Sequence, residues 1–174
     1  MQLYLIRHGI AAERGPHYPD DRQRPLTKAG EARMRLEADA LGGLDIAFDL
    51  ILTSPLLRAK QTAVIVAAGS GTRTATSVTE SEALACNGTP DDVWALLAGH
   101  ADSGAIARVG HEPNLGDLVG TLSGAGAPVR LKKEAICRID VPRDVPRDVP
   151  RDRTRLGELR WFLPPRVLRA IGRG

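Results

Sequence analysis

Short apolar runs alternate with segments of helical spacing along this chain, and that alternation limits the folds open to it. The apolar runs predict strands at residues 2–6, 48–54, 74–80 and 104–110. Apolar spacing, capping residues and glycine stops predict helices at residues 27–43, 54–69, 89–100 and 112–124. Strands that alternate with helices pair in parallel and are covered on both faces. We therefore expect an α/β fold, a single three-layer α/β/α domain over residues 1–174 with a mostly parallel mixed sheet flanked by helices.

Three of the expected helices begin at residues that commonly cap helix N-termini. Thr27 and Thr89 precede two of the helices, and Ser54 followed by Pro55 is typical of a third start. After the fourth helix, residues 134–141 and 158–165 predict a final pair of strands, and residues 165–172 a short helix. These elements complete one domain.

Between the last two strands the unit VPRD occurs three times, at residues 141–152. Proline at every fourth position excludes a helix interior and a central strand. We expect an extended surface loop that enlarges a hairpin, the alternative being an arginine-rich docking loop.

Composition excludes several classes of protein. Lys and Arg number 24 against 21 Asp and Glu, and a net charge of +3 is too small to indicate a nucleic-acid surface. Cys86 and Cys137 lack metal-ligand spacing. No apolar run reaches the roughly 18 residues that a membrane span needs. We expect a soluble, cytoplasmic protein that binds neither nucleic acid nor membrane.

Polar residues gather where the predicted strands end. Arg7, His8 and Gly9 follow the first strand, Arg58 lies in the helix after the second, and His111 follows the fourth. The third exit is acidic, with Glu80 and Glu82. Because ligands bind at the carboxyl ends of parallel strands, two histidines and two arginines are expected at one edge of the sheet.

This set of side chains suits phosphoryl transfer. Two arginines lie close together without repulsion when they share a dianion, and helix N-termini after Ser54 and Glu112 add N–H groups to it. His8 would attack phosphorus as a neutral imidazole, and neighbouring cations lower its pKa. Gly9 leaves room for phosphate beside the backbone. Positioning and charge neutralisation would suffice, so we expect no cofactor and no metal.

Four motifs resemble the histidine phosphatase superfamily, specifically its short bacterial phosphohistidine phosphatase (SixA-like) branch. They are LIRHG, which carries the RHG motif, RPLTKAG (24–30), LTSPLLRAKQTA (52–63) and VGHEPNLGDLVG (109–120). The ending LRWFLPPRVLRAI is also similar to that branch, so the resemblance spans the chain apart from the VPRD repeat. It implies the histidine phosphatase, or phosphoglycerate mutase-like, fold and a role in signal transduction.

The resemblance also assigns roles to single residues. It implies that His8 is the phosphorylated nucleophile, that Arg7 and Arg58 bind the phosphoryl group, and that His111 completes the pocket. Arg24 would line the entrance or form a loop salt bridge, and Asn114 is a further candidate for the site. Glu82, or Asp20 or Asp21, would be the acid that ester-cleaving members of the family carry.

No clear acid motif surrounds Glu82, which bears on the substrate. An alkoxide needs a positioned proton donor, whereas the N–P bond of phosphohistidine breaks once its ring is protonated. We therefore expect a hydrolase acting on a phosphorylated histidine-bearing protein, such as a phosphotransfer domain. One alternative is a broad-specificity phosphomonoesterase acting on small phosphorylated metabolites with Glu82 as acid; a second is a non-catalytic phosphate-binding protein. A mutase is less favoured because no lid segment is visible.

Overall fold

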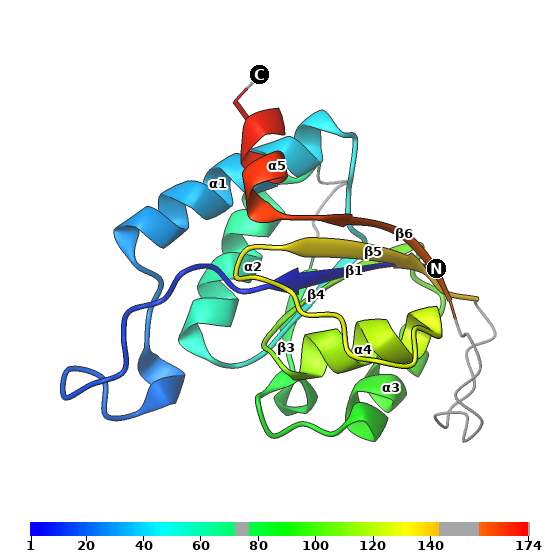
Figure 1. The fold of residues 1–174 in the computed structure, drawn as a ribbon, viewed down its shortest axis with the longest axis horizontal. Coiled ribbons are helices and arrows are strands. Elements are labelled where there is room, and N and C mark those ends of the chain that lie inside the picture. The colour runs from blue at the N-terminus through cyan, green and yellow to red at the C-terminus, as the bar shows by residue number, and fades with distance from the viewer. Residues whose placement is uncertain (72–76, 143–156, 174) are drawn as a thin grey trace.

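The alternation of strands and helices is confirmed in a computed structural model, which describes residues 1–71, 77–142 and 157–173 (Figure 1). The strands are β1 Gln2–Arg7, β2 Leu50–Thr53, β3 Ser77–Glu80, β4 Ala105–Gly110, β5 Ile136–Asp140 and β6 Glu158–Leu163. The helices are α1 Lys28–Gly43, α2 Leu57–Gly69, α3 Pro90–Ala98, α4 Asn114–Ser123 and α5 Pro165–Ile171, with short 3-10 turns η1 Asp21–Gln23 and η2 Glu82–Leu84. Residues 74–76 of the expected third strand, and residues 143–152 of the VPRD repeat, lie outside the described residues.

The six strands form one mixed sheet in the order β3-β2-β4-β1-β5-β6. The first four pair in parallel, as the alternation predicts, while β5 runs antiparallel to β1 and β6 antiparallel to β5. The register of β1 against β4 places Arg7 beside Gly110. His8 and His111 therefore leave the sheet from neighbouring positions at the same edge.

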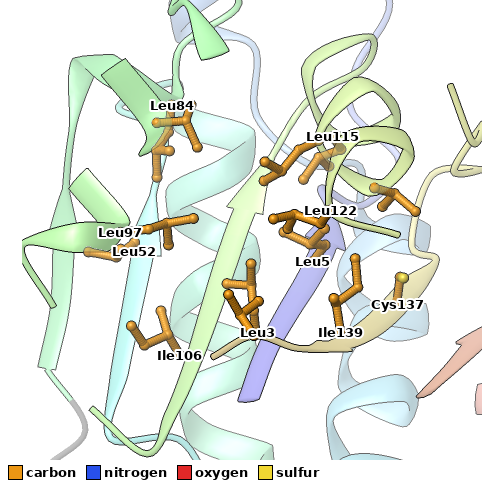
Figure 2. Packing of buried hydrophobic residues seen from close by; sticks show 14 of the residues in the cluster. Leu3, Leu5, Leu52, Leu84, Leu97, Ile106, Leu115, Leu122, Cys137 and Ile139 are labelled. Carbon is orange, nitrogen blue, oxygen red and sulfur yellow. The ribbon is translucent and has the colours of Figure 1, made fainter. Parts of the chain in front are cut away.

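Helices cover both faces of the sheet. Successive residues of a strand point to opposite faces of the sheet. Leu3, Leu5 and Leu52 pack with Leu97 of α3 and Leu115 of α4, as Figure 2 shows. On the opposite face, α1, α2 and α5 contribute to a second core, which contains Tyr4, Ile6, Met34, Leu41, Ala63 and Leu168 (Figure 1). The expected three-layer arrangement is confirmed.

Two of the three expected helix caps are present. The Thr27 side chain accepts a hydrogen bond from the backbone of Gly30, and Thr89 forms a capping box with Asp92. The prediction for Ser54 is wrong: α2 begins at Leu57, and its N-cap residue Leu56 makes no side-chain cap. The hydroxyl of Ser54 contacts His111 instead.

Within the described ranges, no helix is long and apolar enough to cross a bilayer.

Candidate active site

Two buried imidazoles lie against one another at the carboxyl edge of the sheet. His8 follows β1 and His111 follows β4, and their ring centroids are 4.9 Å apart with the planes tilted by 54°. The backbone N–H of His8 donates to the carbonyl of Gly110 at 3.1 Å, which fixes the strand exit next to His111. The structure thus brings together the two histidines that the sequence predicted at one edge.

The environment of His8 sets its tautomer and its charge. Nδ1 lies 2.7 Å from the carbonyl oxygen of Gly9, and because a carbonyl only accepts, Nδ1 carries the proton. The lone pair then resides on Nε2. Burial, the largest cause, together with the charges of Arg58 and Arg7 lowers the pKa of His8 to about 3, against the opposing hydrogen bond to Gly9. At neutral pH His8 is an uncharged imidazole with a free Nε2 lone pair.

His111 is held by a serine from the neighbouring strand exit. Its Nε2 lies 2.8 Å from Oγ of Ser54, and that oxygen accepts from the backbone N–H of Leu56 at 3.3 Å. These two contacts hold the Ser54 hydroxyl against the ring and fix the orientation of the His111 imidazole. Burial lowers the pKa of His111 to about 3, helped by His8 and Arg58.

The two arginines are anchored through their terminal nitrogens. Nη1 of Arg7 donates to the carbonyl of Leu131 at 2.5 Å. Nη1 and Nη2 of Arg58 donate to the carbonyl and the Oδ2 of Asp21 at 2.8 and 2.9 Å. Among the described residues, the Nε atom of each arginine is buried without a hydrogen-bond partner, and so is Nδ1 of His111. Such unpaired buried nitrogens are uncommon in folded proteins, and two of them belong to guanidinium groups, which suit anions.

Asp21 joins three arginines, including Arg24. Its Oδ1 accepts from Nε of Arg24 at 2.6 Å and from Nε of Arg14 at 2.8 Å, and its Oδ2 accepts from Arg58. Arg24 also donates to the carbonyl of Ala12 at 2.6 Å. Burial favours a higher pKa for Asp21, but the three guanidiniums outweigh it and hold that pKa well below its usual range. Asp21 is therefore ionised at neutral pH and cannot serve as a proton donor.

Two other predicted site residues are engaged elsewhere. Glu82 is exposed and forms an ion pair with Arg22 at 2.6 Å, and the hydrogen bonds of that pair lower the pKa of Glu82. The amide of Asn114 donates to the carbonyls of Ala85 and Gly88 at 3.3 and 3.0 Å. Asn114 therefore secures the segment that follows η2.

The glycine of the Arg7-His8-Gly9 tripeptide faces the protein interior. A Cβ on Gly9 would overlap Cγ of Met34 in α1 and press against Leu26. Its backbone N–H donates to Oγ1 of Thr62 at 3.1 Å, and Thr62 donates to the carbonyl of Arg58 at 2.7 Å. Packing against α1 therefore accounts for this glycine independently of the room for phosphate that the sequence suggested.

Sequence reasoning missed Ser54 and Thr62, and it assigned Asp21 only a minor alternative role. Ser54 carries a signal in the sequence, because a hydroxyl residue at a strand exit faces the same edge as the candidate histidines. Thr62 lies four residues after Arg58, one helical turn along. The position of Asp21 depends on how the segment before α1 folds back onto α2, and no local pattern announces it.

In the described part of the chain, no cluster of three or more His, Cys, Asp or Glu side chains is placed to hold a metal ion. Cys86 is exposed and Cys137 is buried, and the two thiols form no disulfide with each other.

The arrangement can now be set beside known proteins. Residues 3–86 match the histidine phosphatase superfamily (branch 1). Over 141 residues the chain is 31% identical to phosphohistidine phosphatase SixA of Escherichia coli. The aligned segment covers 80% of this chain and 84% of that protein. The chain belongs to the histidine phosphatase superfamily. It is also 40% identical over 140 residues to an uncharacterised protein of Picosynechococcus, covering 78% of this chain and 82% of the other.

Solved structures place this histidine phosphatase near SixA. The structure of protein histidine phosphatase SixA complexed with tungstate superposes with a TM-score of 0.79 at 27% identity, covering 95% of this chain and 97% of that one. An alpha-ribazole phosphatase from Shigella flexneri superposes with a TM-score of 0.68 at 20% identity, covering 95% and 97%. The predicted fold and the SixA-like branch of the superfamily are thereby confirmed, and the protein is a phosphatase by family.

Proposed function

We propose that this histidine phosphatase hydrolyses phosphohistidine on a protein, through a covalent intermediate on His8. One observation carries the proposal: His8 is an uncharged imidazole whose Nδ1 proton is held by the carbonyl of Gly9 at 2.7 Å, which leaves Nε2 free to attack phosphorus. The unpaired Nε atoms of Arg7 and Arg58 are suited to bind the phosphoryl oxygens.

In the first step the Nε2 lone pair of His8 forms a bond to phosphorus while the N–P bond of the substrate breaks. The electron pair of that bond goes to the substrate imidazole, which is protonated on its other nitrogen and leaves as a neutral ring. The phosphorylated His8 keeps its proton on Nδ1, hydrogen-bonded to the carbonyl of Gly9. Its ring is therefore cationic, and it is a good leaving group in the next step. Arg7 and Arg58 neutralise charge on the equatorial oxygens, so the step needs no metal or other cofactor.

In the second step a water oxygen bonds to phosphorus and the N–P bond to His8 breaks. The electron pair returns to Nε2, and both protons of the water leave with inorganic phosphate, or one stays on the phosphate and the other passes to solvent. Nδ1 of His111, which has no hydrogen-bond partner in the described part of the chain, would donate its proton to a phosphoryl oxygen in both steps. The free enzyme is then restored with His8 neutral.

The state of Glu82 favours an N–P substrate over a phosphate ester. An ester leaving group requires a protonated acid, but Glu82 is exposed, paired with Arg22 at 2.6 Å and has a lowered pKa. A phosphohistidine ring leaves without such a donor. This argument, with the 31% identity to phosphohistidine phosphatase SixA, supports a phosphorylated histidine-bearing protein as substrate.

The test compares a histidine-phosphorylated phosphotransfer domain with a panel of phosphate esters. We expect phosphate release from the domain, acid-labile label on His8 during turnover, and loss of both in His8→Asn. His17→Asn is the matched control, because His17 is an exposed histidine outside the site. Rapid turnover of esters alone, abolished in Glu82→Gln, would establish the phosphomonoesterase alternative. Binding of phosphate without turnover of any substrate would establish a non-catalytic protein.

A further inference from the structure

Two buried carboxyl groups lie behind the candidate active site, and no step of the proposed reaction uses them. Glu37 on α1 is fully buried, and Glu134, which precedes β5, is 3% exposed. Both accept a hydrogen bond from the same atom, Nη1 of Arg169 on α5, at 2.7 Å for Glu37 and 3.0 Å for Glu134. We call Glu37, Glu134 and Arg169 the carboxylate clamp.

Glu134 contacts the Arg7–Ile10 turn, which carries His8, through its backbone. Its backbone N–H donates to the carbonyls of Arg7 and His8 at 3.2 and 3.4 Å. The backbone of Glu134 has φ 72°, a left-handed conformation that a glutamate adopts only where its surroundings impose it. The chain thus keeps a strained residue at a position that contacts this turn.

Helices α1 and α5 connect to the same turn through the clamp. A Cβ on Gly30, in the first turn of α1, would overlap the carbonyl of Ile10, and a Cβ on Gly172, after α5, would overlap the carbonyl of Leu36. Both helices therefore approach at backbone contact distance. The ion pairs of Arg169 with Glu37 and Glu134 link this helix pair to the strand exit beneath His8.

The charges in the clamp do not balance while both carboxyl groups are ionised. Arg169 offers one nitrogen to both carboxyl groups, and Arg33 of α1 acts on both through space. Within the described residues, Oε2 of Glu37 and Oε1 of Glu134 have no hydrogen-bond partner. Two buried anions on one donor atom repel one another. Burial and the charge of Glu134 raise the pKa of Glu37 to about 8. One proton is therefore retained in the clamp at neutral pH.

We propose that Glu134 is a positioning residue for His8, and that a proton on Glu37 is what allows the carboxylate clamp to stay closed. The clamp holds the Arg7–Ile10 turn in place while Glu37 is neutral. When that proton leaves, repulsion between the two carboxylates loosens the hold of Glu134 on the backbone of Arg7 and His8. The effect on turnover rests on the proposed function; the effect on stability does not.

The first test compares Glu37→Gln with wild type, with Glu31→Gln as the matched control on the same helix. Glu31 is outside the clamp and pairs with Arg35. Because the folded-state pKa of Glu37 is raised, wild-type stability falls as pH rises from about 6.5 to about 8, and we expect a lower urea midpoint at pH 8. Glu37→Gln, which mimics the neutral group, keeps a constant midpoint over that window, whereas Glu31→Gln follows wild type. If the urea midpoint of Glu37→Gln changes with pH in the same way as that of wild type, the proposed role of the Glu37 proton is overturned.

The second test removes the carboxylate of Glu134. Glu134→Gly suits the left-handed backbone and keeps the N–H that binds Arg7 and His8, so we expect it to fold. Its kcat should fall about tenfold with KM little changed, because His8 is misplaced while the arginines still bind phosphate. The wild-type rate should also decline above about pH 8, and Glu37→Gln should remove that decline.

Wild-type kcat in folded Glu134→Gly would overturn the positioning role. A pH-dependent urea midpoint without phosphate release by any form of the enzyme would leave the clamp intact and reject the proposed function instead.

Discussion

Asp21 occupies both terminal nitrogens of Arg58, through its carbonyl at 2.8 Å and its Oδ2 at 2.9 Å. Arg58 is buried, and these contacts fix the guanidinium so that its Nε remains unpaired. The same carboxylate holds Arg24 at 2.6 Å. A residue outside the four sequence-predicted phosphate ligands thus sets the orientation of one of them.

Replacement of Asp21 by Ala should therefore weaken phosphate binding. We expect kcat/KM to fall by roughly tenfold to a hundredfold, because a misplaced phosphate-binding arginine costs that order of rate. Inhibition by tungstate should weaken in parallel. Asp20→Ala is the matched control, since the Asp20 side chain caps η1 by accepting from the backbone N–H of Arg22 at 2.9 Å. Equal kcat/KM values for Asp21→Ala and Asp20→Ala would show that Asp21 does not orient Arg58.

The hydrogen bond between Ser54 and His111 should contribute to kcat. In Ser54→Ala, Nε2 of His111 loses its partner at 2.8 Å, so the ring is no longer held in its orientation. We expect kcat to fall about tenfold, the effect of one hydrogen bond of about 1.4 kcal/mol. Ser70→Ala is the control, because Ser70 is also buried and its Oγ has no hydrogen-bond partner among the residues that the structure describes. An unchanged kcat in Ser54→Ala would remove Ser54 from the site.

The two histidines should make the fold sensitive to acid. Their pKa values are about 3 in the folded protein against 6.5 for free imidazole, so the unfolded chain binds more protons below pH 6.5. The contribution of the two histidines to stability is then complete above pH 6.5 and is lost on acidification, by up to about 1.4 kcal/mol per pH unit for each histidine. Urea unfolding at pH 5 and pH 7 measures this. His8→Asn should reduce the difference, and His17→Asn should leave it unchanged; the reverse pattern would contradict the assignment.

We expect Arg108 to destabilise the fold. It lies fully buried in β4 between Leu5 and Leu52, and none of its three guanidinium nitrogens has a hydrogen-bond partner among the described residues. Burial lowers its pKa to about 10, so it stays charged at neutral pH. We expect Arg108→Met to raise the free energy of unfolding by about 1–4 kcal/mol, the gain seen when buried charges are replaced by apolar groups.

Urea denaturation at pH 7 tests this against Arg35→Met, a change at an exposed arginine of α1. A lower urea midpoint for Arg108→Met than for wild type would show that the guanidinium stabilises the fold.

Most elements followed from local patterns because their causes are local. Continuous apolar runs gave β1 and β2, Thr27 and Thr89 marked the starts of α1 and α3, and glycines marked helix ends. Ser54 was misassigned because a hydroxyl before a helix is suited both to cap it and to bind a side chain from another strand. Glu37 lies three residues after Met34 and four before Leu41, on the apolar stripe of α1, so its burial was visible in the spacing.

The sequence by itself determined the order of strands and helices and the chemistry at three strand exits, because apolar periodicity and capping act over a few residues. Only the tertiary structure decided which groups orient that chemistry. The parallel register of β1 and β4 places His8 beside His111, the fold-back of η1 onto α2 brings Asp21 to Arg58, and the docking of α5 on α1 brings Arg169 to Glu37 and Glu134. Each of these contacts joins residues distant in the chain, and burial at a shared surface creates it.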